Sequence, residues 1–333
     1  MESVHAVSLR FENEIMQIAN ENPFAENLLK KSKSTIERHI RELRNFGVFL
    51  ESRGHAPSLM QWPADWKQVK AKDVHDYKNY LLYGRGLAVS TVNQIIFIVR
   101  SYAALSAAHD GMSESEYFKT TQQARGIRVR EADRIDALRP ITRSSNKKQQ
   151  AVAITRLDAE RLKHEHADDP RGRRDALMMC LLLDYGLRIS DVISLTMQNI
   201  DMNTRTVSVK TQKTGTNLYL SMTDDIYQAA DRYFKHFTPA AEDAPIWYGV
   251  NKHGQIQGGF SKHSAQMRIK QLGEAVGIEG FSAHDCRHYW VTAADRGGSS
   301  LLAITEAGGW TSPTMPARYI NKSKVSNANI KLG

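Results

Sequence analysis

The sequence contains little cysteine and no long apolar run. Its two cysteines among 333 residues, Cys180 and Cys286, lie too far apart to form a metal-ligand pair, and they provide no disulfide framework. Such usage suits a reducing compartment. The longest apolar run, residues 176–183, is far too short to span a bilayer, and the first fourteen residues are too acidic and polar for a signal peptide. We therefore expect a cytoplasmic protein without a membrane partner or a metal.

The composition allows two domains and a polyanionic partner. Of the 333 residues, 41% are hydrophobic, which is enough for a core in each of two ordinary domains. Lys and Arg outnumber Asp and Glu by 45 to 36, and the formal net charge is +9. Clustered Lys and Arg side chains release counterions from phosphates, so nucleic acid is a candidate partner. The charge alone is equally compatible with a basic helical protein that never contacts DNA.

Residues 30–122 have the apolar periodicity of a small helical bundle, preceded by an N-terminal extension over residues 1–29. Ser34, Asp73 and Ser90 are the expected N-terminal caps of three helices, because each precedes apolar residues at helical spacing. The apolar residues are Ile36, Ile40, Leu43, Phe46 and Leu50, then Val74, Tyr77 and Leu81, then Val92, Ile95, Ile96 and Val99. The basic outer residues permit DNA contact, but they are also typical of a solubility face.

Residues 123–152 differ from their surroundings and are predicted to form a basic linker. Apolar periodicity fades there, and Pro140 with the polar cluster 144–146 is typical of irregular chain. Basic side chains outnumber acidic ones between positions 119 and 148, and they are Lys119, Arg125, Arg128, Arg130, Arg134, Arg139, Arg143, Lys147 and Lys148. The alternative is a solvated loop that binds nothing.

Residues 153–322 are predicted to form a mainly helical domain with a small inserted sheet. An apolar helix ends at Gly186, a residue suited to a left-handed C-cap. Between residues 203 and 222, apolar and polar residues alternate around a Gly-containing turn, as in a β-hairpin. Helical patterns return over residues 223–237, 261–276, 282–295 and 300–307. The expected fold class is mainly α, with an N-terminal helical bundle and an α+β second domain that contains a small antiparallel sheet.

Several chemically capable residues of the second domain stand in spaced groups. His284 and Arg287 are three residues apart, so they point the same way on a helix. Asp191 follows Arg188 by three residues, and Tyr319 comes nine residues after the tryptophan of a Gly-Gly-Trp sequence. Cleaving a DNA strand without a metal requires a nucleophile, cationic donors for the phosphate oxygens and an acid for the departing 5′ oxygen, and the sequence offers each of these groups.

In their order and spacing these residues resemble the tyrosine recombinase (phage integrase) family. That family is marked by an arginine in a G-x-R-x-x-E/D box, a β-hairpin lysine, an H-x-x-R box, a His or Trp after a glycine, and a terminal tyrosine. The matching residues are Arg188, Lys213, His284, Arg287, Trp310 and Tyr319. Residues 90–93 and 100–102 also resemble the core-binding domain of the family, so the resemblance covers nearly all of residues 30–322.

The resemblance implies a catalytic role for each matching residue. Arg188 and Arg287 would hold the scissile phosphate through paired hydrogen bonds, and the Trp310 indole would be a third donor. His284 would bond the phosphate or accept the tyrosine proton. Tyr319 would attack phosphorus and form a 3′-phosphotyrosyl bond, and we expect the surrounding cationic groups to favour its phenolate form.

The remaining roles concern proton donation and orientation. Lys213 would protonate the leaving 5′ oxygen, although Lys210, inside the strand, is a rival. Asp191 would orient the cluster, and His288 is expected to be a structural histidine. No metal, ATP or other cofactor is implied, because the phosphotyrosyl ester conserves the energy of the cleaved bond.

By the same resemblance the partner is double-stranded DNA, clamped between the two domains and bound by a homotetramer on two DNA sites. The tail, residues 323–333, is a candidate for exchange between protomers. The side chains expected to contact DNA are Arg38, Arg41, Arg100, Arg125, Arg128 and Arg130. Site-specific recombination for a mobile element is the favoured function. The alternatives are a type IB topoisomerase or telomere resolvase with the same chemistry, or a DNA-binding relative that has lost catalysis; accessory proteins leave no mark in the sequence.

Two features depart from the usual family pattern. Trp310 stands where the family more often has His, so an indole N–H replaces a group capable of acid–base chemistry. Pro316 is expected to interrupt a helix that starts near Pro313, which would place Tyr319 on a short or displaced segment. Use of Tyr319 within its own subunit or in a neighbour's site therefore stays open.

Overall fold

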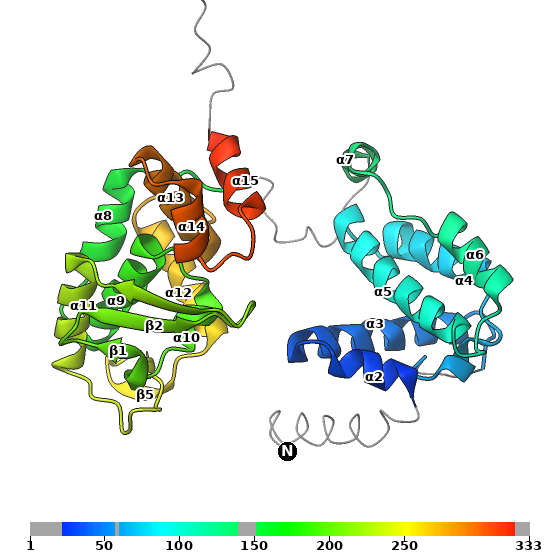
Figure 1. The fold of residues 1–333 in the computed structure, drawn as a ribbon, viewed down its shortest axis with the longest axis horizontal. Helices are drawn as coiled ribbons and strands as arrows, with labels where there is room; N and C mark the ends of the chain where they lie inside the picture. The colour runs from blue at the N-terminus through cyan, green and yellow to red at the C-terminus, as the bar shows by residue number, and fades with distance from the viewer. Residues whose placement is uncertain (1–21, 57–59, 139–150, 324–333) are drawn as a thin grey trace, which may run out of the picture. The chain divides into compact units, whose positions relative to one another are not determined.

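The computed structural model describes residues 22–56, 60–138 and 151–323, and the chain divides into two compact units at position 148 (Figure 1). The first unit is residues 1–148 and the second is residues 149–333. Most of the expected N-terminal extension, the middle of the expected linker and nearly all of the tail lie outside the described residues. Along the described parts of the chain, no helix is both long and apolar enough to cross a membrane.

The first unit is a helical bundle around an aromatic core. Phe46, Trp66, Tyr77 and Tyr102 are fully buried, and the rings of Phe46 and Tyr77 lie 5.0 Å apart between centroids. Its helices are α2 (Pro23–Leu29), α3 (Lys33–Glu51), α4 (Ala71–Asn79), α5 (Val89–Ala107), α6 (Glu114–Gln123) and α7 (Val129–Ala137), with a 3-10 turn at Pro63–Trp66 and a π turn at Tyr80–Gly84.

The three expected helices exist, but the residue at each N-cap position lies two or three positions before the expected cap. Helix α3 is preceded by Ser32 rather than Ser34. Asp73 lies inside the first turn of α4, where its carboxylate accepts a hydrogen bond from the backbone N–H of Lys70 at 2.9 Å. Ser90 likewise lies inside the first turn of α5. A polar side chain in the first turn can satisfy the helix start from within, so the sequence signal is displaced from the true boundary.

Helix α7 lies within the segment that we expected to be an irregular linker. Both carboxylate oxygens of Asp136 accept hydrogen bonds from the backbone N–H of Val89 at 3.1 Å, so α7 caps the start of α5. The side-chain amide of Asn93 bonds both the N–H and the C=O of Ile127 at 2.8 Å. These contacts join residues more than thirty positions apart, and local periodicity does not reveal them.

Helix α2 lies within the expected N-terminal extension and belongs to the bundle core. Phe24 and Leu28 of this helix are buried, and Phe24 packs edge-on against Tyr102 with ring centroids 4.9 Å apart. The side chain of Asn22 accepts a hydrogen bond from the N–H of Phe24 and caps the helix. The helical unit thus starts earlier than residue 30.

The second unit is mainly helical with two small antiparallel sheets, which agrees with the expected fold class. The hairpin strands β2 (Thr206–Lys210) and β3 (Asn217–Ser221) pair with β1 (Ile200–Asp201) in the order β1-β2-β3. A second hairpin, which the sequence did not indicate, joins β4 (Tyr248–Val250) and β5 (Ile256–Gly259). The helices are α8 (Arg156–His164), α9 (Pro170–Asp184), α10 (Ile189–Ile193), α11 (Asp224–Phe234), α12 (Lys262–Ala275), α13 (Ala283–Arg296), α14 (Leu301–Ala307) and α15 (Thr314–Ser323).

Helix α9 is the centre of the second unit. Residues 176–183 of this helix are all buried, because α8, α11 and α13 pack against it. A helix that is apolar on every side is stable only when other elements surround it. Its end therefore fixes the position of the chain that follows, which carries Arg188.

Lys163 cross-links α8, α9 and α11 through a buried ammonium group. Its Nζ donates to the carboxylate of Asp225 and lies 3.4 Å from oxygens of both Asp184 and Glu160. Burial alone would lower the pKa of Lys163, but the hydrogen bond with Asp225 and the nearby carboxylates raise it above its usual value. The ion pairs thus keep this lysine charged in a largely buried position.

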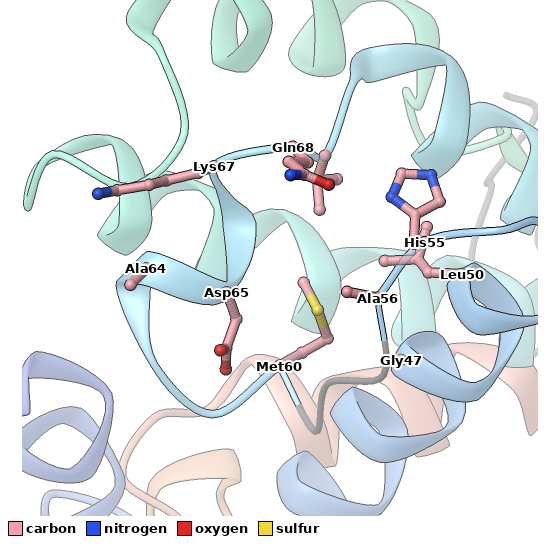
Figure 2. A pocket seen from close by; sticks show the side chains of 10 residues that line it. Gly47, Leu50, His55, Ala56, Met60, Ala64, Asp65, Lys67 and Gln68 are labelled. Carbon is pink, nitrogen blue, oxygen red and sulfur yellow. The ribbon is translucent and has the colours of Figure 1, made fainter.

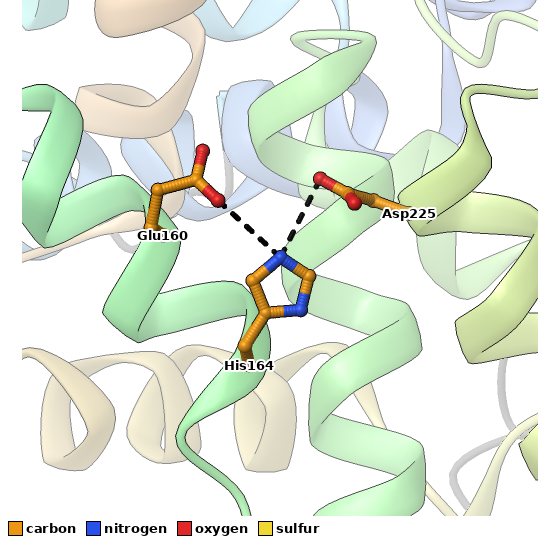
Figure 3. Close-up of side chains that lie close together, drawn as sticks. All are labelled: Glu160, His164 and Asp225. Carbon is orange, nitrogen blue, oxygen red and sulfur yellow. Dashed lines mark ion pairs between the residues drawn. The ribbon is translucent and has the colours of Figure 1, made fainter.

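His164 extends the same cluster, with its Nε2 3.4 Å from Glu160 and 3.5 Å from Asp225 (Figure 3). One imidazole and two carboxylates at such distances have the chemistry of metal ligands. The ammonium of Lys163 already pairs with both carboxylates, however, so the cluster is accounted for as a structural cross-link.

Replacing Lys163 with Met should lower the free energy of unfolding of the second unit by about 2 kcal/mol, because three partly buried carboxylates lose their counter-charge. Urea unfolding followed by tryptophan fluorescence measures this change. Lys119→Met is the matched control, since Lys119 pairs with Glu116 on the surface, and it should cost less than about 0.5 kcal/mol. Equal losses in the two variants would contradict the structural role of Lys163.

Candidate active site

Arg287 is the most connected side chain of the site. It lies on α13, is 4% exposed, and donates from Nη1 to the backbone carbonyl of Gly186 at 2.7 Å and from Nη2 to that of Gly308 at 2.6 Å. Its guanidinium carbon lies 3.6 Å from the ring centroid of Trp310. Arg287 therefore connects the loop that precedes Arg188 with the loop that carries Trp310.

The start of α13 sets the direction of the His-x-x-Arg box. Ser282 precedes the helix and donates its hydroxyl to Asp285 Oδ2 at 2.6 Å, while Asp285 Oδ1 accepts from the N–H of Val152 at 2.9 Å. Asp285 is buried, so these bonds fix the first turn against the beginning of the second unit. His284 and Arg287 follow one turn apart, as their spacing predicted.

Both the backbone conformation at position 186 and the nearby ring of Trp290 require a glycine there. Its φ is +59°, a left-handed conformation that favours glycine, and a Cβ at this position would lie 2.6 Å from the ring of Trp290. Trp290 in turn stacks on Trp310, with centroids 6.3 Å apart and an interplanar angle of 19°. The absence of a side chain at 186 thus lets the helix end approach the aromatic pair.

Arg188 and Asp191 form an ion pair beside the hairpin. Arg188 Nη1 lies 3.7 Å from Asp191 Oδ2, and neither atom makes a hydrogen bond within the part of the chain that the structure describes, although both are buried. Asp191 is only 1% exposed. Its other carboxylate oxygen, Oδ1, accepts a hydrogen bond from the backbone N–H of Gln212 at 2.9 Å. Asp191 therefore ties the loop of Arg188 to the residue that precedes Lys213.

Lys213 lies in the exposed turn between β2 and β3. Thr211 stabilises this turn, because its N–H donates to Thr216 O and its hydroxyl oxygen accepts from Thr216 N–H. The rival Lys210 is the last residue of β2 and is also exposed. Lys213 thus directly follows the residue that is hydrogen-bonded to Asp191, and its side chain is exposed.

Three aromatic rings of the same unit surround Tyr319. The ring centroids of His288, His284 and Trp310 lie 5.2, 5.7 and 6.2 Å from that of Tyr319. His284 is exposed, whereas His288, Trp310 and Tyr319 are half-buried. The sequence motif indicated two of these rings; His288 was interpreted as a structural residue, and only the packing of α15 against α13 reveals its contact with Tyr319.

The expectation that Pro316 interrupts the helix before Tyr319 is wrong. Helix α15 begins at Thr314, so Pro316 occupies its first turn, where backbone N–H groups have no helical partner to lose. The N–H of Ala317 bonds Pro313 O at 3.0 Å and continues the turn. Tyr319 thus lies on a regular helix of ten residues.

Burial, rather than the arginines, dominates the ionisation of Tyr319. Burial raises the pKa of this phenol above its usual value, and the charges of Arg287 and Arg188 only partly oppose the effect. The expected preference for phenolate is therefore wrong for the protein without DNA. Burial and the like charge of Arg188 lower the pKa of Arg287 to about 9, so that guanidinium stays charged at neutral pH.

The residues expected to contact DNA all lie in the first unit. Arg38 donates to the side chain of Gln94 at 2.7 Å, and Arg41 pairs with Glu42 at 3.0 Å while remaining 63% exposed. Arg100 has a buried Nε. The other three, which are exposed near α6 and α7, are Arg125, Arg128 and Arg130.

A cavity of about 280 Å³ lies elsewhere in the first unit (Figure 2). Its lining includes His55, Met60, Asp65 and Lys67. None of the residues that the sequence motifs identify lines this cavity. The cavity is therefore separate from the group around Tyr319.

The structure brings Tyr319 together with His284, Trp310 and Arg287, which are residues of the motif that resembles the tyrosine recombinases. The sequence profile of the phage integrase family matches residues 148–325, more than half of the chain. The chain belongs to this family, the tyrosine recombinases.

Curated relatives agree with the family assignment. The chain is 21% identical over 306 residues to tyrosine recombinase XerC of Staphylococcus carnosus. These residues make up 90% of this chain and 89% of the relative. It is 24% identical over 299 residues to XerC of Roseiflexus sp., covering 89% and 85% of the two chains. The integrase of Salmonella phage P22 is 26% identical over 145 residues, which are 41% of this chain and 36% of the relative.

Solved structures show the same fold. The Tn1549 transposon integrase in complex with a circular intermediate DNA has a TM-score of 0.60 at 16% identity, covering 89% of this chain and 93% of that one. A lambda integrase dimer bound to a COC′ core site has a TM-score of 0.58 at 12% identity and covers 100% of both chains.

Replacing Gly186 with Ala should lower the free energy of unfolding by about 3 kcal/mol, because a left-handed backbone and a contact with the Trp290 ring both oppose a Cβ. Gly277→Ala is the matched control, since Gly277 has a φ of +83° but open space around it, and it should cost about 1 kcal/mol. Urea unfolding compares the two variants. If the two variants lose similar amounts of unfolding free energy, the ring of Trp290 moves aside, and its packing does not require a glycine at position 186.

Proposed function

We propose that this protein is a site-specific DNA recombinase that cleaves and rejoins double-stranded DNA through a 3′-phosphotyrosyl intermediate. The observation that carries the proposal is the position of Tyr319, which lies beside His284, His288 and Trp310 and within the electrostatic influence of Arg287 and Arg188. A phosphate at this place would meet cationic donors and a nucleophile together.

Arg188 and Arg287 hold the scissile phosphate in this proposal. The Arg188 side chain remains 22% exposed, and its guanidinium carries five N–H groups, so part of it is available to a phosphate oxygen. Arg287 uses two N–H groups on backbone carbonyls, but a guanidinium carries further N–H groups in the same plane. The backbone bonds orient Arg287 in advance, which lowers the cost of ordering it when DNA binds.

Proton transfer is divided between the two ends of the cleaved bond. Because burial raises its pKa, Tyr319 carries its proton at neutral pH and needs an acceptor during attack. His284 is exposed beside the phenol ring and serves as that acceptor or as a phosphate ligand. Lys213 protonates the leaving 5′ oxygen, and the bond from Gln212 to Asp191 holds its turn near Arg188.

Tyr319 acts within its own subunit in this proposal. Its neighbours His284, His288 and Trp310 all come from the same chain, on α13 and on the loop before α15. Helix α15 packs against both α13 and α14. A neighbour's site would require α15 to leave these contacts.

The assembly is proposed from the relatives and from charge. The arginines of the first unit, led by the exposed Arg41, Arg125, Arg128 and Arg130, contact the phosphate backbone of the duplex. Solved neighbours include integrases bound to DNA, one of them a dimer on a core site. We propose a tetramer on two DNA sites, with recombined junctions as products; relaxed circles or hairpin ends would instead favour a topoisomerase or a telomere resolvase.

Tyr319→Phe should abolish covalent attachment to DNA, because the phenol oxygen is the nucleophile. Nicked duplex DNA that contains the recombination site is incubated with protein, and adducts are separated on a denaturing gel. Tyr219→Phe, at an exposed position of β3, is the matched control and should form the adduct like the wild type. An adduct that persists in Tyr319→Phe would remove Tyr319 from its role.

Lys213→Ala should slow cleavage of ordinary DNA by at least about 100-fold, as expected when a general acid is lost. A substrate with sulfur at the 5′ bridging position should restore the rate, because a thiolate leaves without protonation. Lys210→Ala is the control and should cleave both substrates normally. Sulfur rescue of Lys210→Ala, with none for Lys213→Ala, would exchange the two assignments.

A further inference from the structure

His288 lies against the nucleophile although it is outside the residues that mark the family motif. Its ring centroid is 5.2 Å from that of Tyr319, and the two planes meet at 85°. His284, four positions earlier on α13, is slightly farther away at 5.7 Å and less perpendicular at 62°. Residues four apart lie on the same face of a helix, so the two imidazoles stand one above the other beside Tyr319.

The two histidines differ in exposure. His284 is exposed, whereas His288 is half-buried. The backbone at His288 is also fixed, because Thr292 donates its hydroxyl to the carbonyl of His288 at 3.1 Å and the preceding residue, Arg287, is anchored at both ends of its guanidinium. His288 is therefore the more rigid of the two contacts to Tyr319.

Tyr319 requires such a contact because its attack depends on the direction of the phenol oxygen. The tyrosine lies in the second turn of a helix that starts only at Thr314, and its side chain is half-buried rather than enclosed. Edge-to-face packing of aromatic rings favours one orientation over others. A reactive group held near the attack geometry reacts faster than one that samples several rotamers.

We propose that His288 is a positioning residue whose ring holds the phenol of Tyr319 in the orientation for attack, while His284 acts on the phosphate. The inference rests on the proposed function for the role of Tyr319 as nucleophile. It assigns the effect of His288 to the shape and packing of its ring, and not to proton transfer.

The first test compares three variants in single-turnover cleavage of nicked DNA at saturating protein. His288→Ala should form the covalent adduct about 10-fold more slowly with unchanged DNA affinity, because only the orientation of Tyr319 is lost. His288→Phe keeps an aromatic ring and should cleave within about 2-fold of the wild type. His288→Gln keeps polarity without a ring and should resemble His288→Ala. His253→Ala, in the exposed β4–β5 turn, is the control and should match the wild type.

Two outcomes would overturn the proposal. One is wild-type cleavage by His288→Ala; the other is rescue by Gln with none by Phe, which would make hydrogen bonding the function of His288. If His288→Ala does not fold, as judged by thermal unfolding, the comparison of Phe with Gln still decides. If the wild-type protein forms no adduct through Tyr319, the proposed function is refuted instead. The contact between His288 and Tyr319 can still be examined by the second test.

The second test needs no DNA and no activity. The tyrosine ring resonances of the free full-length protein are recorded by NMR with selectively labelled tyrosine, and Tyr319→Phe identifies the signal of Tyr319. His288→Ala should shift that signal and narrow it toward a mobile ring, because the perpendicular imidazole is its nearest aromatic neighbour. His288→Phe should retain a displaced, ordered signal. An unchanged Tyr319 signal in His288→Ala would refute the contact itself.

Discussion

The buried guanidinium of Arg287 is the interaction on which the site depends. Its two hydrogen bonds to the carbonyls of Gly186 and Gly308 join loops that are more than one hundred residues apart in the sequence. A buried charge is tolerated only when it is hydrogen-bonded, so these loops are fixed where the guanidinium requires them. Arg188 and Trp310 each follow an anchored glycine by two residues, so this one contact helps to set the positions of both.

The same burial that orients the site also opposes its chemistry. Burial raises the pKa of Tyr319 and lowers that of Arg287, so the free protein holds a protonated phenol beside charged arginines. Such a site is inactive without an acceptor for the phenolic proton and a phosphate to bind the cations. In the proposed mechanism, His284, which lies beside Tyr319, takes the first task. The phenol of Tyr319 would then stay neutral until DNA completes the site.

Much of the fold followed from residues close together in the sequence. The hairpin around Lys213 was evident from period-two alternation, and the one-turn separation of His284 and Arg287 from their spacing. Elements fixed by distant polar contacts were missed. Helix α7 exists where Asp136 caps α5 and Asn93 bonds Ile127, and nothing in the local pattern indicates those bonds. Pro316 was misjudged because the effect of proline depends on where the helix begins.

The sequence by itself determined the family, because an ordered set of boxes ending in Tyr319 has few other origins. It did so because spacing along a helix or a turn is a local property that needs no knowledge of the fold. Only the tertiary structure decided how these side chains meet: the buried bonds of Arg287, the tether from Asp191 to the lysine turn, and the imidazole of His288 against Tyr319. Each joins separate elements, and such contacts arise only when the chain packs around α9.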